Sequence, residues 1–165
     1  MVGELSAVSD QPSAFGKAVG NLFSGGPTNV SWARALEGLG AEEAGRVPEG
    51  LPHSVAQIAA HVAFWQDFVL EEAGGGTPVR PAHAAGGWPE PGDWEETRTR
   101  LLDGQARLRS LTRDPAFISG VTREGHPWAA LLANFAGHGL YHLGQVVTVR
   151  RALGLWPPPG GGDTW

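Results

Sequence analysis

The sequence contains no cysteine, only one lysine, and no long uninterrupted apolar run. Without cysteine, disulfide bonds, thiolate metal ligands and a cysteine nucleophile are all excluded. Any site for a borderline-soft metal ion must therefore be built from the six histidines. Arg, Asp, Glu or His interrupts each long helical stretch, so no segment is expected to span a membrane.

Acidic residues outnumber basic ones, with 17 Asp and Glu against 12 Lys and Arg, and the net charge is −5. A broad nucleic-acid surface needs clustered Lys and Arg, so this balance argues against a nucleic-acid partner. The opening residues, MVGELSAVSDQPS, have neither a basic start nor a long apolar core, unlike a signal peptide. We therefore expect a cytoplasmic protein without a membrane partner.

Glycine and proline divide the chain into helical segments. We expect helices at about 12–24 and 30–39, from Ser54 up to the glycines at 74–76, at 94–112, and at 127–153. No strand-type alternation is sustained, and neither a repeat nor a linker is present. The sequence therefore predicts an all-α four-helix bundle with an additional short helix. It forms a single domain over residues 1–165 and carries a Pro/Gly-rich tail at 155–165.

The helix that follows Ser54 has the clearest start. Ser54 and Gln57 stand three residues apart, the spacing of a capping box. Apolar residues then recur at intervals of 3, 4, 3 and 4, which predicts one buried stripe: Val55, Ile58, Val62, Trp65 and Val69.

The segment GHGLYHLGQ, at 137–145, places two histidines four residues apart in a largely apolar helix. On a helix, His138 and His142 point the same way. A buried polar pair is costly without partners, and two such rings can aim their nitrogens at one metal ion. A pair of separately satisfied core histidines is the alternative. The helical projection puts the pair at the centre of one inward stripe: Leu131, Asn134, Phe135, His138, His142, Gln145 and Val149.

His61 is the expected third ligand, because it lies beside the apolar stripe of its own helix. Taken alone it would be interpreted as a buried, satisfied histidine, and the pair at 138 and 142 is what favours the ligand role. Asp67, Glu71 and Glu72 project to other sides of that helix and are not expected to bind the ion. The three remaining histidines occupy loop or helix-start positions and are expected at the surface or as caps: His53, His83 and His126.

Two segments, HSVAQIAAHVAFWQDFVLE and NFAGHGLYHLGQVVTVRRALGLWPPPGGGDTW, resemble the DinB-like superfamily, which includes the damage-inducible and YfiT-type groups. The early segment SWARALEGLGAEEAGRVP resembles the family's short second helix and the loop after it. The family's first metal histidine is followed four residues later by tryptophan, as His61 is by Trp65. Its other two form H-x3-H followed by x2-Q, as His138, His142 and Gln145 do.

The resemblance implies a divalent metal ion (zinc, nickel, manganese or iron) bound by His61, His138 and His142. The order of metal affinities at imidazole sites favours zinc or nickel over manganese, so zinc or nickel is expected first. Characterised relatives include thiol transferases that act with bacillithiol or mycothiol and a mycothiol-dependent isomerase. The implied function is a metal-dependent transfer of a low-molecular-weight thiol to an electrophile. A metal-dependent hydrolase and a non-catalytic, metal-binding stress-response bundle remain alternatives, because the same three histidines serve all three.

Asn134 and Gln145 are candidates to orient a ligand ring or a bound water. Tyr141, the only tyrosine, is a candidate contact to the substrate, although aromatic packing is its preferred role. Arg150 and Arg151 are candidates for binding a carboxylated thiol. For these two we prefer a favourable interaction with the C-terminal dipole of their helix.

Two expectations concern the surface. Seven tryptophans, several near helix ends (Trp32, Trp94, Trp128, Trp156), predict a homodimer, because aromatic residues favour interfaces. DinB-like relatives are often dimers, which favours the same conclusion. In the tail, residues 157–159 are three prolines, which are expected to turn the chain back so that Trp165 docks on the bundle or on a partner subunit.

Overall fold

The computed structural model describes residues 14–26 and 29–161, which contain helices and two isolated bridges but no strand. None of the helices in these residues is both long enough and apolar enough to cross a membrane. The prediction of an all-α bundle is confirmed. The elements are α1 (Ala14–Ser24), α2 (Trp32–Ala35), α3 (Ala41–Gly45), α4 (Val55–Ala73), the 3-10 helix η1 (Ala84–Gly87), α5 (Trp94–Leu111), α6 (Pro115–Ser119) and α7 (Trp128–Ala152).

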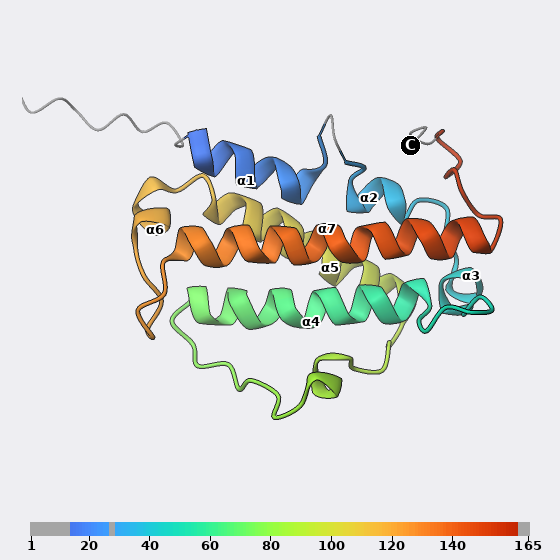
Figure 1. The fold of residues 1–165 in the computed structure, drawn as a ribbon, viewed down its shortest axis with the longest axis horizontal. Coiled ribbons are helices and arrows are strands. Elements are labelled where there is room, and N and C mark those ends of the chain that lie inside the picture. Colours follow the sequence, from blue (N-terminus) through green and yellow to red (C-terminus); the bar gives the residue numbers. More distant parts are fainter. Residues whose placement is uncertain (1–13, 27–28, 162–165) are drawn as a thin grey trace, which may run out of the picture.

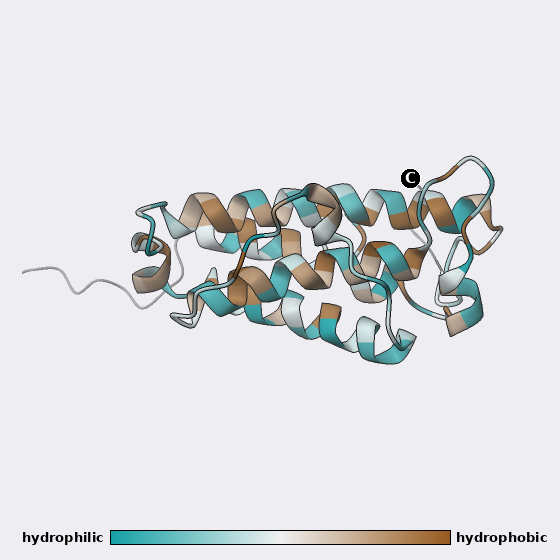
Figure 2. Cartoon of the chain, turned by 90° about the horizontal axis from the view of Figure 1, so that it is seen from below, coloured by the Kyte–Doolittle hydropathy of each residue, from teal (hydrophilic) through white to brown (hydrophobic). Residues whose placement is uncertain are grey.

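Four long helices form the bundle, in the cyclic order α1, α5, α4, α7. Helices α1 and α7 run in one direction, and α4 and α5 run in the other (Figure 1). Because α4 and α5 are parallel neighbours, the chain must travel back along the 19 residues of α4, about 28 Å, before α5 can begin. Residues 74–93 make this crossover and carry η1 near its middle (Figures 1 and 2).

The predicted start of α4 is confirmed in detail. The main-chain N–H of Gln57 donates to Oγ of Ser54, and the N–H of Ser54 donates to Oε1 of Gln57. Asp93 caps α5 in a related way by accepting from the N–H of Glu96. These caps satisfy main-chain donors that a helix leaves unpaired, so both helices that the crossover joins begin at fixed residues.

The apolar core consists of two clusters, one at each end of the bundle. One is centred on Ile58, Leu101 and Val146, and the other on Phe23, Leu108 and Leu132. The long helices show apolar and polar residues mixed along their visible sides (Figure 2). Along α4 and α7, the buried polar residues Gln66 and His142 fall between the two clusters. The middle of the bundle is therefore its polar level.

The predicted inward stripe of α7 coincides only in part with the side that is buried, since His142 and Val149 are its only fully buried members. Asn134 is exposed, and Leu131 and Phe135 are only half-buried. The side of α7 that faces the core carries Leu132 and Ala136. This side is buried because α7 packs against α1, α2 and α4. The polar stripe consequently lies on the flank of α7. The buried residues of the helix are Trp128, Leu132, Ala136, Gly139, His142, Leu143, Val146, Val149 and Arg150.

The tryptophan argument for a dimer does not hold for the described residues. Trp32, Trp94 and Trp128 are buried within the single chain. The other three described tryptophans are half-buried: Trp65, Trp88 and Trp156. These six rings pack within the single chain, in the two core clusters or under the crossover. The described tryptophans therefore provide no exposed aromatic surface that would need a second subunit to cover it.

The tail folds back, as predicted for its prolines. Pro158 is fully buried, and Pro159 lies against Gly38. The guanidinium of Arg34 then donates to the main-chain oxygens of Gly160 and Gly161. The expected docking of Trp165 concerns a position outside the described residues.

The structure excludes the other role considered for Arg150, which was binding a carboxylated thiol. Its side chain is buried, donates to the main-chain oxygens of Ala35 and Leu155, and lies against the ring of Trp156. Arg150 therefore ties α7 to the end of α2 and to the start of the tail. It is a structural residue and is not available to bind a ligand.

Candidate metal centre

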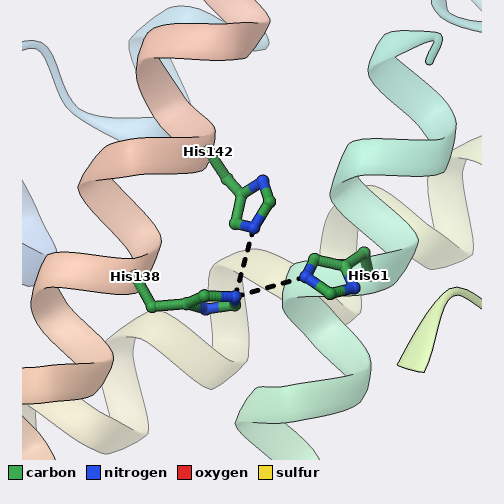
Figure 3. A group of neighbouring side chains, drawn as sticks. All are labelled: His61, His138 and His142. Carbon is green, nitrogen blue, oxygen red and sulfur yellow. Dashed lines mark hydrogen bonds between the residues drawn. The ribbon is translucent and has the colours of Figure 1, made fainter. Parts of the chain in front are cut away.

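Three histidines from two helices meet in the middle of the bundle (Figure 3). Nε2 of His138 lies 3.2 Å from Nε2 of His61 and 3.1 Å from Nε2 of His142. The candidate ligand atoms all lie within 4.8 Å of one another. Metal–nitrogen bonds of 2.0–2.1 Å in a tetrahedral site would put such nitrogens about 3.4 Å apart. The three side chains that the sequence analysis singled out are therefore together, at a spacing compatible with one metal ion.

The other ring nitrogen of two histidines is fixed by an acceptor. Nδ1–H of His61 donates to the main-chain oxygen of Gly87 at 2.5 Å, and Nδ1–H of His142 donates to Oε1 of Gln145 at 2.7 Å. In a neutral ring this leaves the lone pair on Nε2. The neutral His138 ring can place at most one proton on its Nε2. Three nitrogens with at most one proton among them therefore face one another, which is the donor set that a divalent cation satisfies.

Burial keeps these rings neutral. It lowers the pKa of His142 to about 4, despite the opposing effect of the hydrogen bond to Gln145. Burial also lowers the pKa of His61, more than the Gly87 oxygen raises it, and it lowers the pKa of His138, helped by the nearby charge of His61. Because a metal ligand must be unprotonated, these shifts favour metal binding at neutral pH.

Trp88 covers the site from the crossover. Its ring stacks on that of His61, with centroids 3.9 Å apart and planes 14° apart. On the other face of Trp88, the ring of His53 stacks at 4.0 Å and 17°. His53 is therefore half-buried in a stack of three rings and is not the surface residue that its position before the helix cap predicted. Stacking on Trp88 therefore restricts the orientation of the His61 ring.

Gly87 can reach His61 because it has no side chain. A Cβ atom at this position would lie 2.8 Å from the Trp65 ring, closer than real contacts allow. Glycine thus lets the main chain approach α4 closely enough for its oxygen to accept from Nδ1 of His61. Sequence reasoning missed Gly87, Trp88 and His53, because their contacts depend on the path of the crossover and follow no helical period.

A cavity of about 370 Å³ lies between α4 and α7 and is bordered by one of the three histidines. His138 forms part of its wall and is the only one of the three that is not fully buried. The remaining wall is mostly apolar, with Asn134, Glu72 and Arg80 as its other polar residues. Its apolar residues are Trp65, Phe68, Val69, Leu131 and Phe135. The volume lies within the range of small-molecule sites, so a ligand of modest size could reach His138.

The predicted orienting residues differ in what they contact. Gln145 contacts His142 as predicted, and its amide Nε2 donates to the hydroxyl of Tyr141 at 3.1 Å. Tyr141 is 65% exposed and lies edge-on to the His142 ring, so it is not packed in the core. Asn134 lines the cavity beside His138, and none of the hydrogen bonds among the described residues joins it to a histidine.

The acidic residues of α4 and two of the remaining histidines were predicted to lie away from the metal site, and all but one of them do. Asp67 pairs with Arg100, and Glu71 is exposed. Glu72 is the exception, since it lines the cavity that His138 borders. His83 and His126 are exposed and lie away from the three histidines.

The fold and site together define an all-α helical bundle with a three-histidine group compatible with metal binding. The sequence matches the DinB superfamily over residues 30–146, which is most of the chain and includes all three histidines. The protein belongs to the DinB superfamily. No curated protein and no solved structure matches the chain.

Proposed function

We propose that the protein binds one divalent metal ion through His61, His138 and His142. We further propose that it uses the ion to join a low-molecular-weight thiol, of the bacillithiol or mycothiol type, to an electrophile. Zinc and nickel are the proposed metals, because imidazole suits both and both bind such sites more tightly than manganese or iron. When bound, such an ion lowers the pKa of a water or thiol at an open position.

The observation that carries the metal proposal is the convergence of three Nε2 atoms, two of which belong to rings whose Nδ1 is held by an acceptor. Holding Nδ1–H fixes both the tautomer and the orientation of each ring. Two isolated core histidines would need only each other as partners. They would not need a third ring aimed at the same point or a glycine that brings the Gly87 oxygen to His61.

A catalytic role is supported by the access that the site has. His138 is half-exposed and forms part of the 370 Å³ cavity, whereas an ion that only braces the core would need no such opening. The cysteine-free chain also offers no thiol of its own to compete with a thiol substrate. In the reaction, the sulfur of the deprotonated thiol forms a bond to carbon while the electrophile's leaving group departs with its electron pair.

The chain's own residues would position the reactants. Gly87 and Gln145 hold protons on Nδ1 of His61 and His142, and Trp88 shields His61 from solvent. The apolar wall around His138 would hold the electrophile and limit the entry of water. In this proposal the three histidines are the only metal ligands from the chain, and no Asp or Glu side chain completes the coordination.

Elemental analysis of the purified protein, paired with a transfer assay, tests the proposal. We expect about one equivalent of zinc or nickel per chain. We also expect bacillithiol or mycothiol to react with 1-chloro-2,4-dinitrobenzene, releasing chloride, faster than the uncatalysed background. Chelator treatment should return the rate to background, and metal replacement should restore it. A stoichiometric metal without turnover of either thiol would favour the non-catalytic stress-response bundle, and hydrolysis of an ester substrate would favour the hydrolase.

A further inference from the structure

The cavity beside His138 has a cation at its wall. Arg80, from the crossover, is one of the residues that line it. The guanidinium carbon of Arg80 lies 5.2 Å from the centroid of the Phe68 ring and 6.0 Å from that of the Trp65 ring. Cation–π contacts at these distances hold an arginine over an aromatic surface. The side chain is therefore directed over the apolar wall of the cavity.

Arg80 keeps its hydrogen-bonding groups available. Across residues 14–26 and 29–161, no ion pair or side-chain hydrogen bond involves its guanidinium. By contrast, Arg34, Arg98 and Arg100 each pair with a carboxylate of the chain. A guanidinium stacked on aromatic rings still presents N–H donors at its edge, in the fork that matches a carboxylate.

We propose that this cavity binds an apolar or aromatic carboxylate, whose ring packs against the wall formed by α4 and α7 and whose acid group pairs with Arg80. This ligand class combines the two properties that the wall presents: a largely apolar surface and one unpaired guanidinium. If the protein is a thiol transferase, as proposed above, this ligand is the electrophile. That extension rests on the proposed function, whereas the binding itself does not.

Glu72 lines the same cavity and would repel an anion. It forms no ion pair with Arg80, so it does not neutralise the guanidinium directly. A divalent ion at the three histidines would add two positive charges next to the cavity, on the His138 side. With the ion bound, the charges of Arg80, Glu72 and the metal sum to a positive value, which favours an anionic ligand.

Binding of 2-naphthoate, compared with the neutral 2-naphthalenemethanol, tests the proposal by calorimetry on the protein as purified. We expect Arg80→Gln to weaken naphthoate binding about tenfold, as loss of a charge-assisted hydrogen bond should. Affinity for the neutral alcohol should stay within about twofold, because the apolar wall is unchanged. Arg107→Gln is the matched control, since it removes the same charge from α5 at a different surface hollow; both affinities should be unchanged.

A second variant locates the ligand. Leu131 lines the cavity from α7, and Leu131→Trp should fill the space and weaken both compounds, with circular dichroism confirming the helical fold. Repeating the titrations after chelation separates this inference from the proposed function. If Arg80→Gln leaves naphthoate binding unchanged both with and without metal, the inference is wrong even where metal binding and thiol transfer are intact. If the protein binds no metal but Arg80→Gln still weakens naphthoate binding, the inference is supported and the proposed metal-dependent function is wrong.

Discussion

The main-chain oxygen of Gly87 lies 2.5 Å from Nδ1 of His61, joining the crossover to the first half of α4. The contact exists because α4 and α5 are parallel neighbours, so the segment between them returns along α4 (Figure 1). This returning segment places the Gly87 oxygen, a hydrogen-bond acceptor, and the ring of Trp88 against His61. The environment of the site is therefore set partly by the bundle's topology.

We expect Gly87→Ala to weaken zinc binding by about 10- to 100-fold, the usual effect of losing a partner that orients a metal ligand. The added Cβ would lie 2.8 Å from the Trp65 ring, so the ring and the main chain must separate, and we expect the main-chain oxygen to move away from His61. Competition with a chromophoric chelator measures the affinity. Gly92→Ala is the control in the same crossover, since a Cβ there meets no atom within 4 Å. Equal affinities for the two variants would contradict the role given to Gly87.

Replacing a proposed ligand should have a larger effect. We expect His142→Ala to lower metal affinity by more than about 100-fold and to abolish metal-dependent turnover, while circular dichroism still reports a helical bundle. His126→Ala, which removes an exposed histidine, should bind metal normally. Full metal content in the His142 variant would rule out the three-histidine site.

Without metal, the stability of the protein should fall as the solution is acidified through the histidine range. The pKa of His142 is about 4 in the folded state and about 6.5 when the chain is unfolded. Between these values the unfolded chain binds more protons than the folded one, so the free energy of unfolding rises with pH and falls with acidification. Urea denaturation of chelated protein should give a lower midpoint at pH 5 than at pH 7. The drop should be smaller in His142→Gln, and an equal drop in both proteins would assign the pH dependence to other groups.

The buried amide of Gln66 should destabilise the bundle. Both of its amide atoms are buried and have no hydrogen-bond partner among the described residues. Gln66→Met keeps a similar shape without the polar atoms, so we expect the free energy of unfolding to rise by about 1 kcal/mol. Chemical denaturation measures it, and a loss of stability would show that the amide is satisfied in solution.

Gly104→Ala should lower the free energy of unfolding, because its Cβ would lie 2.3 Å from Oε1 of Gln66.

The homodimer stays a prediction, now without the support of the tryptophans. Six of the seven are buried or half-buried within the single chain, and the seventh, Trp165, lies outside the described residues. What favours a dimer is the behaviour of DinB-like relatives that the resemblance implies. Light scattering at micromolar concentration should give twice the chain mass of 17.3 kDa, and a value of 17.3 kDa would refute it.

The four long helices and the pairing of His138 with His142 could be predicted because both depend on local spacing, whereas the short elements α3, η1 and α6 were not predicted. The capping box at Ser54 and the four-residue interval between His138 and His142 are properties of neighbouring residues on one helix. The side of α7 that is buried could not be predicted in the same way. It depends on which helices pack around α7, and the buried residues coincide only in part with the stripe that the helical projection selected.

The sequence by itself determined the class of fold, the absence of cysteine ligands and of a cysteine nucleophile, and the identity of the candidate ligands, since composition and helical period are read directly from residue order. Only the tertiary structure decided what surrounds those ligands. Gly87, Trp88 and Arg80 belong to a crossover without a repeating pattern, and they reach the site because parallel packing of α4 and α5 brings that segment back along α4. Contacts between residues far apart in the chain depend on topology, and local spacing does not encode it.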